Sequence, residues 1–169
     1  MGEPARDGPG DWVLLSYRLP REPSTPRSAV WRKLRKLGVA QISDGFVGLP
    51  AGPRTREQLE WIGEEVTDAG GTSAIWLARP ATRAQEEQLA QTMAGARAAE
   101  YQAVISAATA ARDEPTADLV ASASLVRRLR NELRAIQRRD YFPPAEREQA
   151  EAAVQELTAD ARDARLGTP

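Results

Sequence analysis

Cysteine and histidine are both absent from the 169 residues. The chain therefore has no thiolate nucleophile, no disulfide, no soft metal ligand and no imidazole base, which excludes most familiar catalytic constellations. Apolar runs reach only a few residues, and the start "MGEPARDGPG" lacks the order of a signal peptide. We expect a cytoplasmic protein without enzymatic activity, bound to no membrane and needing no metal and no cofactor.

An excess of charge of either sign is also missing. Lys and Arg number 23 against 24 Asp and Glu, for a formal net charge of −1. The surface as a whole therefore lacks the net positive charge that is typical of proteins that bind nucleic acid. Such a partner would have to be bound by local clusters of cations.

Residues 12–80 alternate between the two kinds of secondary structure. Strands are expected at residues 12–19, 39–43, 46–49 and 72–79, and helices at residues 26–37 and 55–69. This order of strand, helix, strand, strand, helix, strand predicts an α+β fold of the ferredoxin-like, split βαβ type.

Turn and cap residues support these bounds. Thr25 before Pro26 is typical of an N-cap with proline at the first helical position, and Thr55 with Gln58 forms a capping-box pattern. Gly38 ends the first helix. Asp44-Gly45 between two apolar segments predicts a hairpin with a type I′ turn.

After Pro80 only helical periodicity remains. One long helix is broken near Asp113-Glu114-Pro115, a second carries Leu119, Val126 and Leu133 at seven-residue spacing, and a third spans residues 145–166. We therefore expect a disordered tail at 1–11, a ferredoxin-like domain at 12–80 and a three-helix C-terminal extension at 81–166.

The first helix carries a cluster of cations with no acid between them: Arg27, Arg32, Lys33, Arg35 and Lys36. With Val30 and Leu34 facing the sheet, the cations fall on the opposite side. Like charges at helical spacing cost about 0.2–0.5 kcal/mol each, which an anion would offset. The cluster predicts contact with the DNA backbone. The alternative is pairing with the acids of the second helix, which are Glu57, Glu60, Glu64, Glu65 and Asp68.

A second cluster lies on the heptad helix: Arg127, Arg128, Arg130, Arg134, Arg138 and Arg139. Guanidinium forks suit tetrahedral oxyanions, so these residues are oxyanion-binding candidates. The sequence favours the alternative, in which the acids of the last helix fold back against them. Those acids are Glu146, Glu148, Glu151, Glu156, Asp160 and Asp163.

The four tryptophans are expected in the core: Trp12, Trp31, Trp61 and Trp76. Trp31 and Trp61 lie off the main apolar stripes of their helices, so one or both could line an interface. Gly70-Gly71 is a helix stop rather than a phosphate-binding loop, and no serine or threonine has a visible base partner. The sequence therefore predicts no catalytic residue.

Three stretches carry a family resemblance: "LLSYRLP", the tryptophan-led basic helix and "RRDYFPP". From Trp12 to about Leu157 the chain resembles the N-terminal domain of the chromate-resistance regulator ChrB family. More distantly, the first half is similar to the ferredoxin-like domains of phenylacetate-degradation repressors and small CRISPR-associated nucleases. The resemblance implies a chromate-responsive regulator that acts at promoter DNA as a homodimer, with a separate C-terminal regulator domain as a further partner.

Departures from these families narrow the expectation. The first strand ends in Arg18, Leu19 and Pro20, without the metal-binding acid of the related nucleases, which argues against a degenerate nuclease. Chromate is a tetrahedral dianion that arginines can bind, and the chain has no thiol to reduce it. Without a recognisable helix-turn-helix, DNA contacts are expected mainly at phosphates. The remaining alternative is a dimerisation or protein-interaction module that does not bind DNA.

Overall fold

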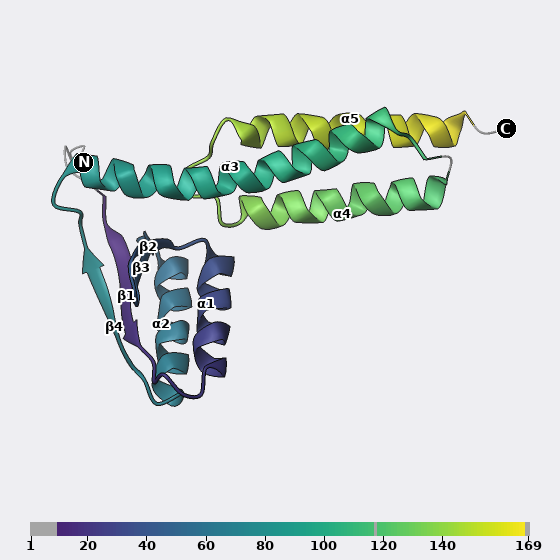
Figure 1. Ribbon diagram of the computed structural model, residues 1–169. Coiled ribbons are helices and arrows are strands. Elements are labelled where there is room, and N and C mark those ends of the chain that lie inside the picture. Colours follow the sequence, from purple (N-terminus) through teal and green to yellow (C-terminus); the bar gives the residue numbers. More distant parts are fainter. Residues whose placement is uncertain (1–9, 117, 168–169) are drawn as a thin grey trace. The chain divides into compact units, whose positions relative to one another are not determined.

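The computed structural model describes residues 10–116 and 118–167. Residues 1–9 of the expected tail lie outside this range. The chain forms two compact units, one ending at Met93 and the other beginning at Ala94 (Figure 1). We call them the sheet unit and the helical unit.

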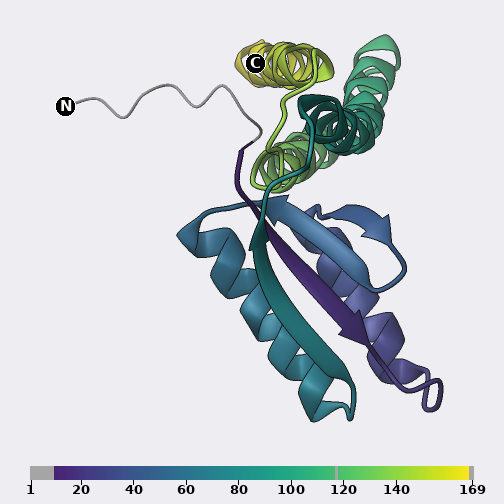
Figure 2. The ribbon, with the colours of Figure 1, turned by 90° about the vertical axis from the view of Figure 1, so that its left-hand side faces the viewer.

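The sheet unit contains β1 (Trp12–Arg18), α1 (Thr25–Leu37), β2 (Ala40–Ser43), β3 (Phe46–Pro50), α2 (Pro53–Asp68) and β4 (Thr72–Ala78). The four strands form one antiparallel sheet in the order β2-β3-β1-β4. Figure 2 shows α1 and α2 side by side on one face of this sheet. The α+β class expected from the sequence is confirmed.

The core of the sheet unit lies between the sheet and these two helices. Leu15 on β1 is fully buried and pairs in register with Val47 of β3 and Ile75 of β4. Leu34 of α1 and Leu59 of α2 are also buried. Burying a leucine side chain is worth about 1.5–3 kcal/mol, so the apolar stripes of the two helices hold them on the sheet.

Only one of the four tryptophans is in the core. Trp12 is 2% exposed, whereas the exposed fractions of Trp31, Trp61 and Trp76 are 45%, 59% and 53%. The expectation of a core position was therefore wrong for Trp76, which lies on β4 and donates its indole N–H to Ser16 Oγ at 3.0 Å. The positions of Trp31 and Trp61 agree with their offset from the apolar stripes.

The structure tests the turn and cap residues that the sequence predicts. Gly38 has the left-handed φ of 72° that ends α1, as expected. In the hairpin between β2 and β3 only Gly45 has a positive φ, so the expected type I′ turn, which needs positive φ at two residues, was wrong. The expected caps were also wrong, because Ser24 and Gly52 precede the two helices and the Thr55 hydroxyl donates to Pro50 O at 2.8 Å.

Three helices follow the sheet: α3 (Arg83–Asp113), α4 (Leu119–Gln137) and α5 (Glu146–Leu166). The break after Asp113 was expected from Pro115. The helical unit has its own core, in which Tyr101 and Val104 of α3, Leu129 and Ile136 of α4, and Val154 of α5 are buried. Across the part of the chain that the structure describes, no helix combines the length and apolar character that a membrane span requires.

The start of α4 is fixed by a side-chain cap. Asp118 Oδ1 accepts hydrogen bonds from the backbone N–H groups of Val120 at 2.9 Å and Ala121 at 3.1 Å. We expect Asp118→Ala to lower the free energy of unfolding by about 1 kcal/mol, as measured by urea denaturation. Ser24→Ala is the matched control, because Ser24 precedes α1 without capping it through its side chain. Equal losses in both variants would contradict the role of Asp118.

Candidate anion-binding sites

A cavity of about 1020 Å³ lies at the N-terminal half of α1. Four arginines line it, two from the first-helix cluster and two from the end of β1 and the loop that follows: Arg27, Arg32, Arg18 and Arg21. Tyr17, Trp31 and Asp44 are among the other residues of its walls. We call this cavity the α1 pocket.

Within the described residues, Arg27 and Arg32 of the α1 pocket each use one N–H group in a contact with a backbone oxygen. Arg27 Nη2 reaches Pro20 O at 3.5 Å, and Arg32 Nε donates to Ser28 O at 3.3 Å. A guanidinium carries five N–H donors, so each of these two side chains can still bind an anion. Asp44 is the acid that lines the pocket.

Tyr17 gives the α1 pocket a neutral hydroxyl. Burial raises the pKa of the Tyr17 phenol above its ordinary value, the negative charge of Asp44 raises it further, and Arg27 partly offsets both. The phenol therefore stays protonated at neutral pH and can donate one hydrogen bond beside the arginines.

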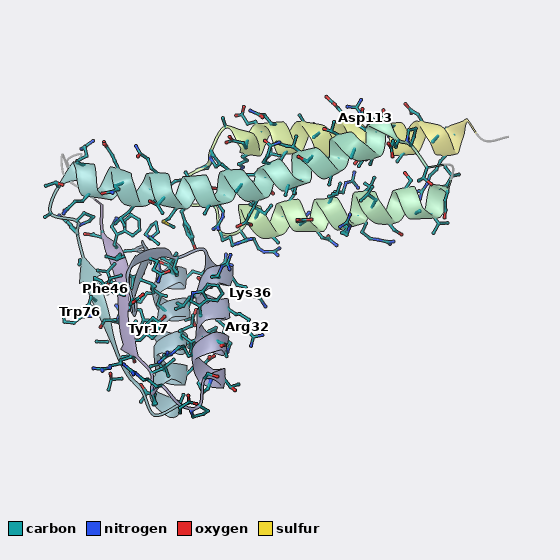
Figure 3. All side chains as sticks on the ribbon, viewed as in Figure 1. Tyr17, Arg32, Lys36, Phe46, Trp76 and Asp113 are labelled. Atoms are coloured by element: carbon teal, nitrogen blue, oxygen red, sulfur yellow. The ribbon has the colours of Figure 1, made fainter. Side chains whose placement is uncertain are left out.

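The other three cations of α1 differ in their surroundings. Lys33 Nζ lies 2.5 Å from Glu65 Oε1 on α2, and the Arg35 guanidinium stacks on the Trp31 ring with 4.6 Å to its centroid. Lys36 and Arg32 point away from α2 (Figure 3). Among the described residues, the acids of α2 thus neutralise one of the five α1 cations, so internal pairing accounts for little of the cluster.

In the part of the chain that the structure describes, the arginines of α4 do not pair with the acids of α5, although the sequence favoured this. Glu156 and Asp160 of α5 instead contact Arg112 of α3, with Arg112 Nε 2.7 Å from Asp160 Oδ2. Glu151 contacts Arg147 on its own helix at 3.2 Å. Within residues 10–116 and 118–167, five arginines have no acidic partner: Arg127, Arg128, Arg130, Arg134 and Arg138.

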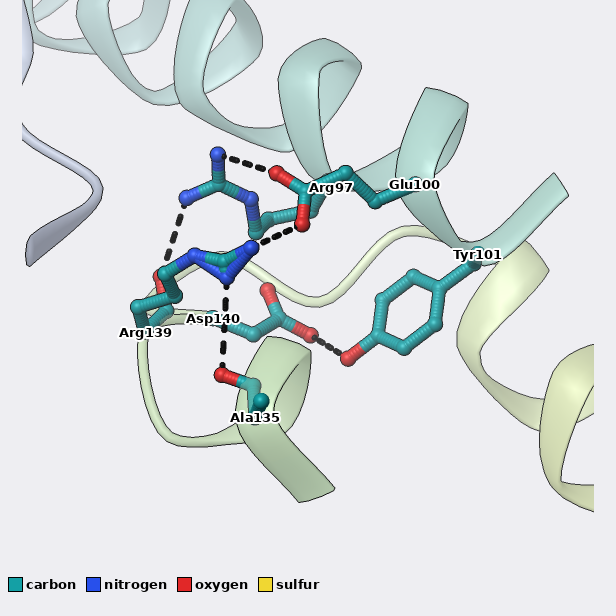
Figure 4. Close-up of polar contacts among 6 residues, drawn as sticks. All are labelled: Arg97, Glu100, Tyr101, Ala135, Arg139 and Asp140. Carbon is teal, nitrogen blue, oxygen red and sulfur yellow. Dashed lines mark hydrogen bonds and ion pairs between the residues drawn. The ribbon is translucent and has the colours of Figure 1, made fainter. Parts of the chain in front are cut away.

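Arg139 differs from the rest of its cluster because it is built into the helical unit (Figure 4). Its guanidinium contacts Glu100, which also binds Arg97 at 2.8 Å, and donates to Ala135 O at 3.5 Å. Burial lowers the pKa of the Arg139 guanidinium, and Glu100 opposes that effect. Since Glu100 and Ala135 O contact its two terminal nitrogens, Arg139 has a structural role and is not open to an oxyanion.

Two residues beside Arg139 complete this polar cluster. The Tyr101 hydroxyl donates to Asp140 Oδ2 at 2.8 Å, and burial together with this hydrogen bond raises the pKa of the Tyr101 phenol. The side chain of Asp140 is fully buried and also lies 3.7 Å from Arg147. The "RRDYFPP" turn is therefore joined to α3 by charged and polar side chains.

Sequence reasoning missed four arginines that line these cavities. Arg18 and Arg21 enter the α1 pocket, while Arg162 and Arg165 of α5 face a second concave surface beside the α4 arginines. The spacing of three between Arg162 and Arg165 was a usable signal, because it places both side chains on one face of the helix. The six acids of the same helix made the helix look acidic overall, so these two arginines were not considered as site residues.

No metal centre emerges from the described residues, where no group of three or more Asp and Glu side chains could hold an ion. The chemistry that these surfaces offer is that of guanidinium groups: paired hydrogen bonds and permanent positive charge directed at oxyanions. The fold and the sites thus define an α+β protein with two arginine-lined concave surfaces, one in each unit, whose chemistry suits anions.

Comparison with known proteins gives the particular family. The chain belongs to the family described as "Protein ChrB, N-terminal", whose model matches residues 27–164. It is 26% identical over 152 residues to Protein ChrB of Cupriavidus metallidurans, an alignment covering 88% of this chain and 45% of the relative. The chain thus spans about half the length of that protein. No solved structure matches it.

Proposed function

We propose that this protein is a chromate-responsive transcriptional regulator domain that binds promoter DNA of a chromate-resistance operon as a cytoplasmic homodimer, without enzymatic activity. Membership of the ChrB N-terminal family supports a role in chromate resistance. The order β1, α1, β2, β3, α2, β4 supports a ferredoxin-like assignment for the sheet unit.

The α1 cations carry the DNA-binding part of the proposal. Among the described residues, Arg27, Arg32, Arg35 and Lys36 have no acidic partner, and two of them line the α1 pocket. Cations that remain unneutralised by their own protein attract phosphates, and the release of counterions from DNA drives such binding. The contacts are to the backbone, so they position the protein on the duplex without reading bases.

The test is a salt titration of the triple variant Arg32→Gln, Arg35→Gln and Lys36→Gln. We expect weaker binding to labelled operon DNA, with the slope of log K against log salt flattened by about 0.9 for each phosphate that the variant no longer neutralises. Fluorescence anisotropy at several salt concentrations measures both quantities.

The matched control for this titration is the double variant Lys33→Gln and Arg56→Gln. Both side chains are already held by acids, Lys33 by Glu65 and Arg56 by Glu60 at 2.7 Å. This variant should keep nearly the wild-type slope, and a triple variant that keeps it too would overturn the α1 assignment.

The chromate response is tested in the same titration. Chromate should release operon DNA, whereas sulfate at equal concentration, a dianion of the same tetrahedral shape, controls for ionic strength. Without a cysteine, the protein can respond by binding the oxyanion but not by reducing it through a thiol. Equal release by both anions would remove chromate from the proposal.

Exposed apolar side chains on the sheet favour a second candidate, a dimerisation or protein-interaction module. Leu77 and Trp76 on β4 and Ile42 on β2 are 63%, 53% and 40% exposed, and both strands are edges of the sheet. Edge strands with apolar side chains invite pairing with another chain. A stable dimer in sedimentation analysis, with no affinity for DNA at low salt, would favour this function over the first.

A further inference from the structure

The helical unit contains a groove of about 460 Å³ between α4 and α5. Its walls carry arginines from both helices: Arg127, Arg130 and Arg134 of α4, with Arg162 and Arg165 of α5. We call it the α4–α5 groove. Because cations face it from two sides, it differs from a single charged helix face exposed to water.

No carboxylate lines the groove among the described residues. Two of the α5 acids, Glu156 and Asp160, are held by Arg112 of α3. Arg127 has one weak side-chain contact, with Ser124 Oγ at 3.4 Å. The fold thus directs these two acids to another side of α5 and leaves Arg162 and Arg165 beside the arginines of α4.

The positions of these charges describe the shape of the ligand. Residues 127, 130 and 134 follow the spacing of three and four that places side chains on one face of a helix, and they span roughly 10 Å along the axis. One strand of a duplex presents a phosphate about every 3.4 Å of its axis, so the row of arginines is about as long as three phosphate-to-phosphate steps of one strand.

A compact anion fits this arrangement less well. One tetrahedral dianion would neutralise two of the five charges and leave like charges facing one another across the groove. Small side chains, Ala123 and Ala161, form part of the lining and leave room between the arginine rows for a chain to lie along them. An extended polyanion can instead contact arginines along the whole length of the groove.

We propose that the α4–α5 groove binds the phosphodiester backbone of nucleic acid, as a second contact separate from the α1 cations. This inference rests on the proposed DNA-binding function and adds a surface to it. Arg128 and Arg138 lie on α4 or at its end but do not line the groove, and Arg139 is held by Glu100.

The experiment compares two double variants that each remove two arginines from the same segment. Arg127→Gln with Arg134→Gln alters the groove, whereas Arg128→Gln with Arg138→Gln alters arginines outside it. Binding of a labelled 20-base-pair duplex is measured by anisotropy at several salt concentrations. We expect the groove variant to lower the magnitude of the salt slope by about 1.8, because two phosphates are no longer neutralised, and the control to change it by less than about half as much.

All four side chains are exposed, so we expect both variants to keep the fold. Thermal unfolding of both variants checks this. Equal changes of slope in the two variants would show a diffuse charge effect and overturn the groove. A normal slope in the groove variant, with the α1 triple variant defective, would also overturn it. A reduced slope in the groove variant, with a normal slope in the α1 triple variant, would support the groove and overturn the α1 assignment. A failure of the groove proposal can therefore be distinguished from a failure of the α1 assignment.

Inorganic tripolyphosphate separates nucleic acid from a free polyanion. Calorimetry should show that tripolyphosphate binds the wild-type protein more weakly than the duplex does at the same salt concentration, and that it competes with the duplex. Tight tripolyphosphate binding that depends on Arg127 and Arg134, together with a duplex slope that does not, would assign the groove to a free polyanion and overturn the proposal. No duplex binding even at low salt would refute both DNA contacts.

Discussion

Glu100→Ala is expected to lower the free energy of unfolding by about 3 kcal/mol. Glu100 binds two arginines at once, Arg97 on its own helix and Arg139 at the start of the turn that follows α4 (Figure 4). The Arg97 side chain is 9% exposed and that of Arg139 is 22% exposed. Removing one partner of a buried ion pair leaves an uncompensated charge in the protein interior, away from water, which costs about 3–5 kcal/mol. The partial exposure of Glu100 places the expected loss at the lower end.

Urea denaturation followed by circular dichroism measures this loss. Glu156→Ala is the control, because it also removes an acid that contacts an arginine of α3, but both side chains of that pair are well exposed. Exposed ion pairs contribute little, so the control should unfold close to the wild-type midpoint. If both variants unfold at the same urea concentration, Glu100 does not hold the turn to α3.

Gly45→Ala is expected to destabilise the protein by a similar amount, about 3 kcal/mol. Gly45 has a φ of 68°, and a Cβ atom there would lie 2.3 Å from the backbone oxygen of Tyr17. A left-handed conformation costs a residue with a side chain about 1–2 kcal/mol, and relieving a clash with backbone typically costs a further 1–3 kcal/mol. The turn cannot move away freely, because Tyr17 N donates to Gly45 O at 2.7 Å.

The matched control changes a glycine that has room for a side chain. Apart from its chain neighbours and the backbone of its own helix, α3, no atom of the described residues lies within 4 Å of a Cβ added at Gly95. Gly95→Ala should therefore stabilise the protein by about 0.5–1 kcal/mol through the helix propensity of alanine. Urea denaturation of both variants checks the contrast, and a Gly45→Ala midpoint at or above that of the wild type would refute the steric argument.

Local chemistry was sufficient to predict most of the elements. Gly38 and Pro115 mark helix ends through the backbone conformations that they require or forbid, and Asp44-Gly45 marks a hairpin. The type of turn was not predictable to the same degree, because the close approach of Tyr17 helps to decide it. Likewise, Thr55 was expected to cap α2, but its hydroxyl donates a hydrogen bond to the backbone oxygen of Pro50.

Partners that are distant in the sequence were harder to predict. The acids of α5 and the arginines of α4 are adjacent in chain order, which suggested that they pair, yet Arg112 of α3 lies closer to Glu156 and Asp160. Helical periodicity gives the face that a residue shares with its neighbours, but the rotation of one helix against the next depends on how their cores pack. The α4–α5 groove follows from that packing.

Among the described residues, every charge that lines the α4–α5 groove belongs to a guanidinium, and the sequence contains no histidine. Arginine does not lose its proton under conditions in which proteins remain folded. The groove therefore keeps a constant charge over the whole range of cellular acidity, unlike sites built on imidazole or on buried lysine. If the groove binds nucleic acid as proposed, we expect its occupancy to respond to the concentration of competing anions and not to protonation of the groove.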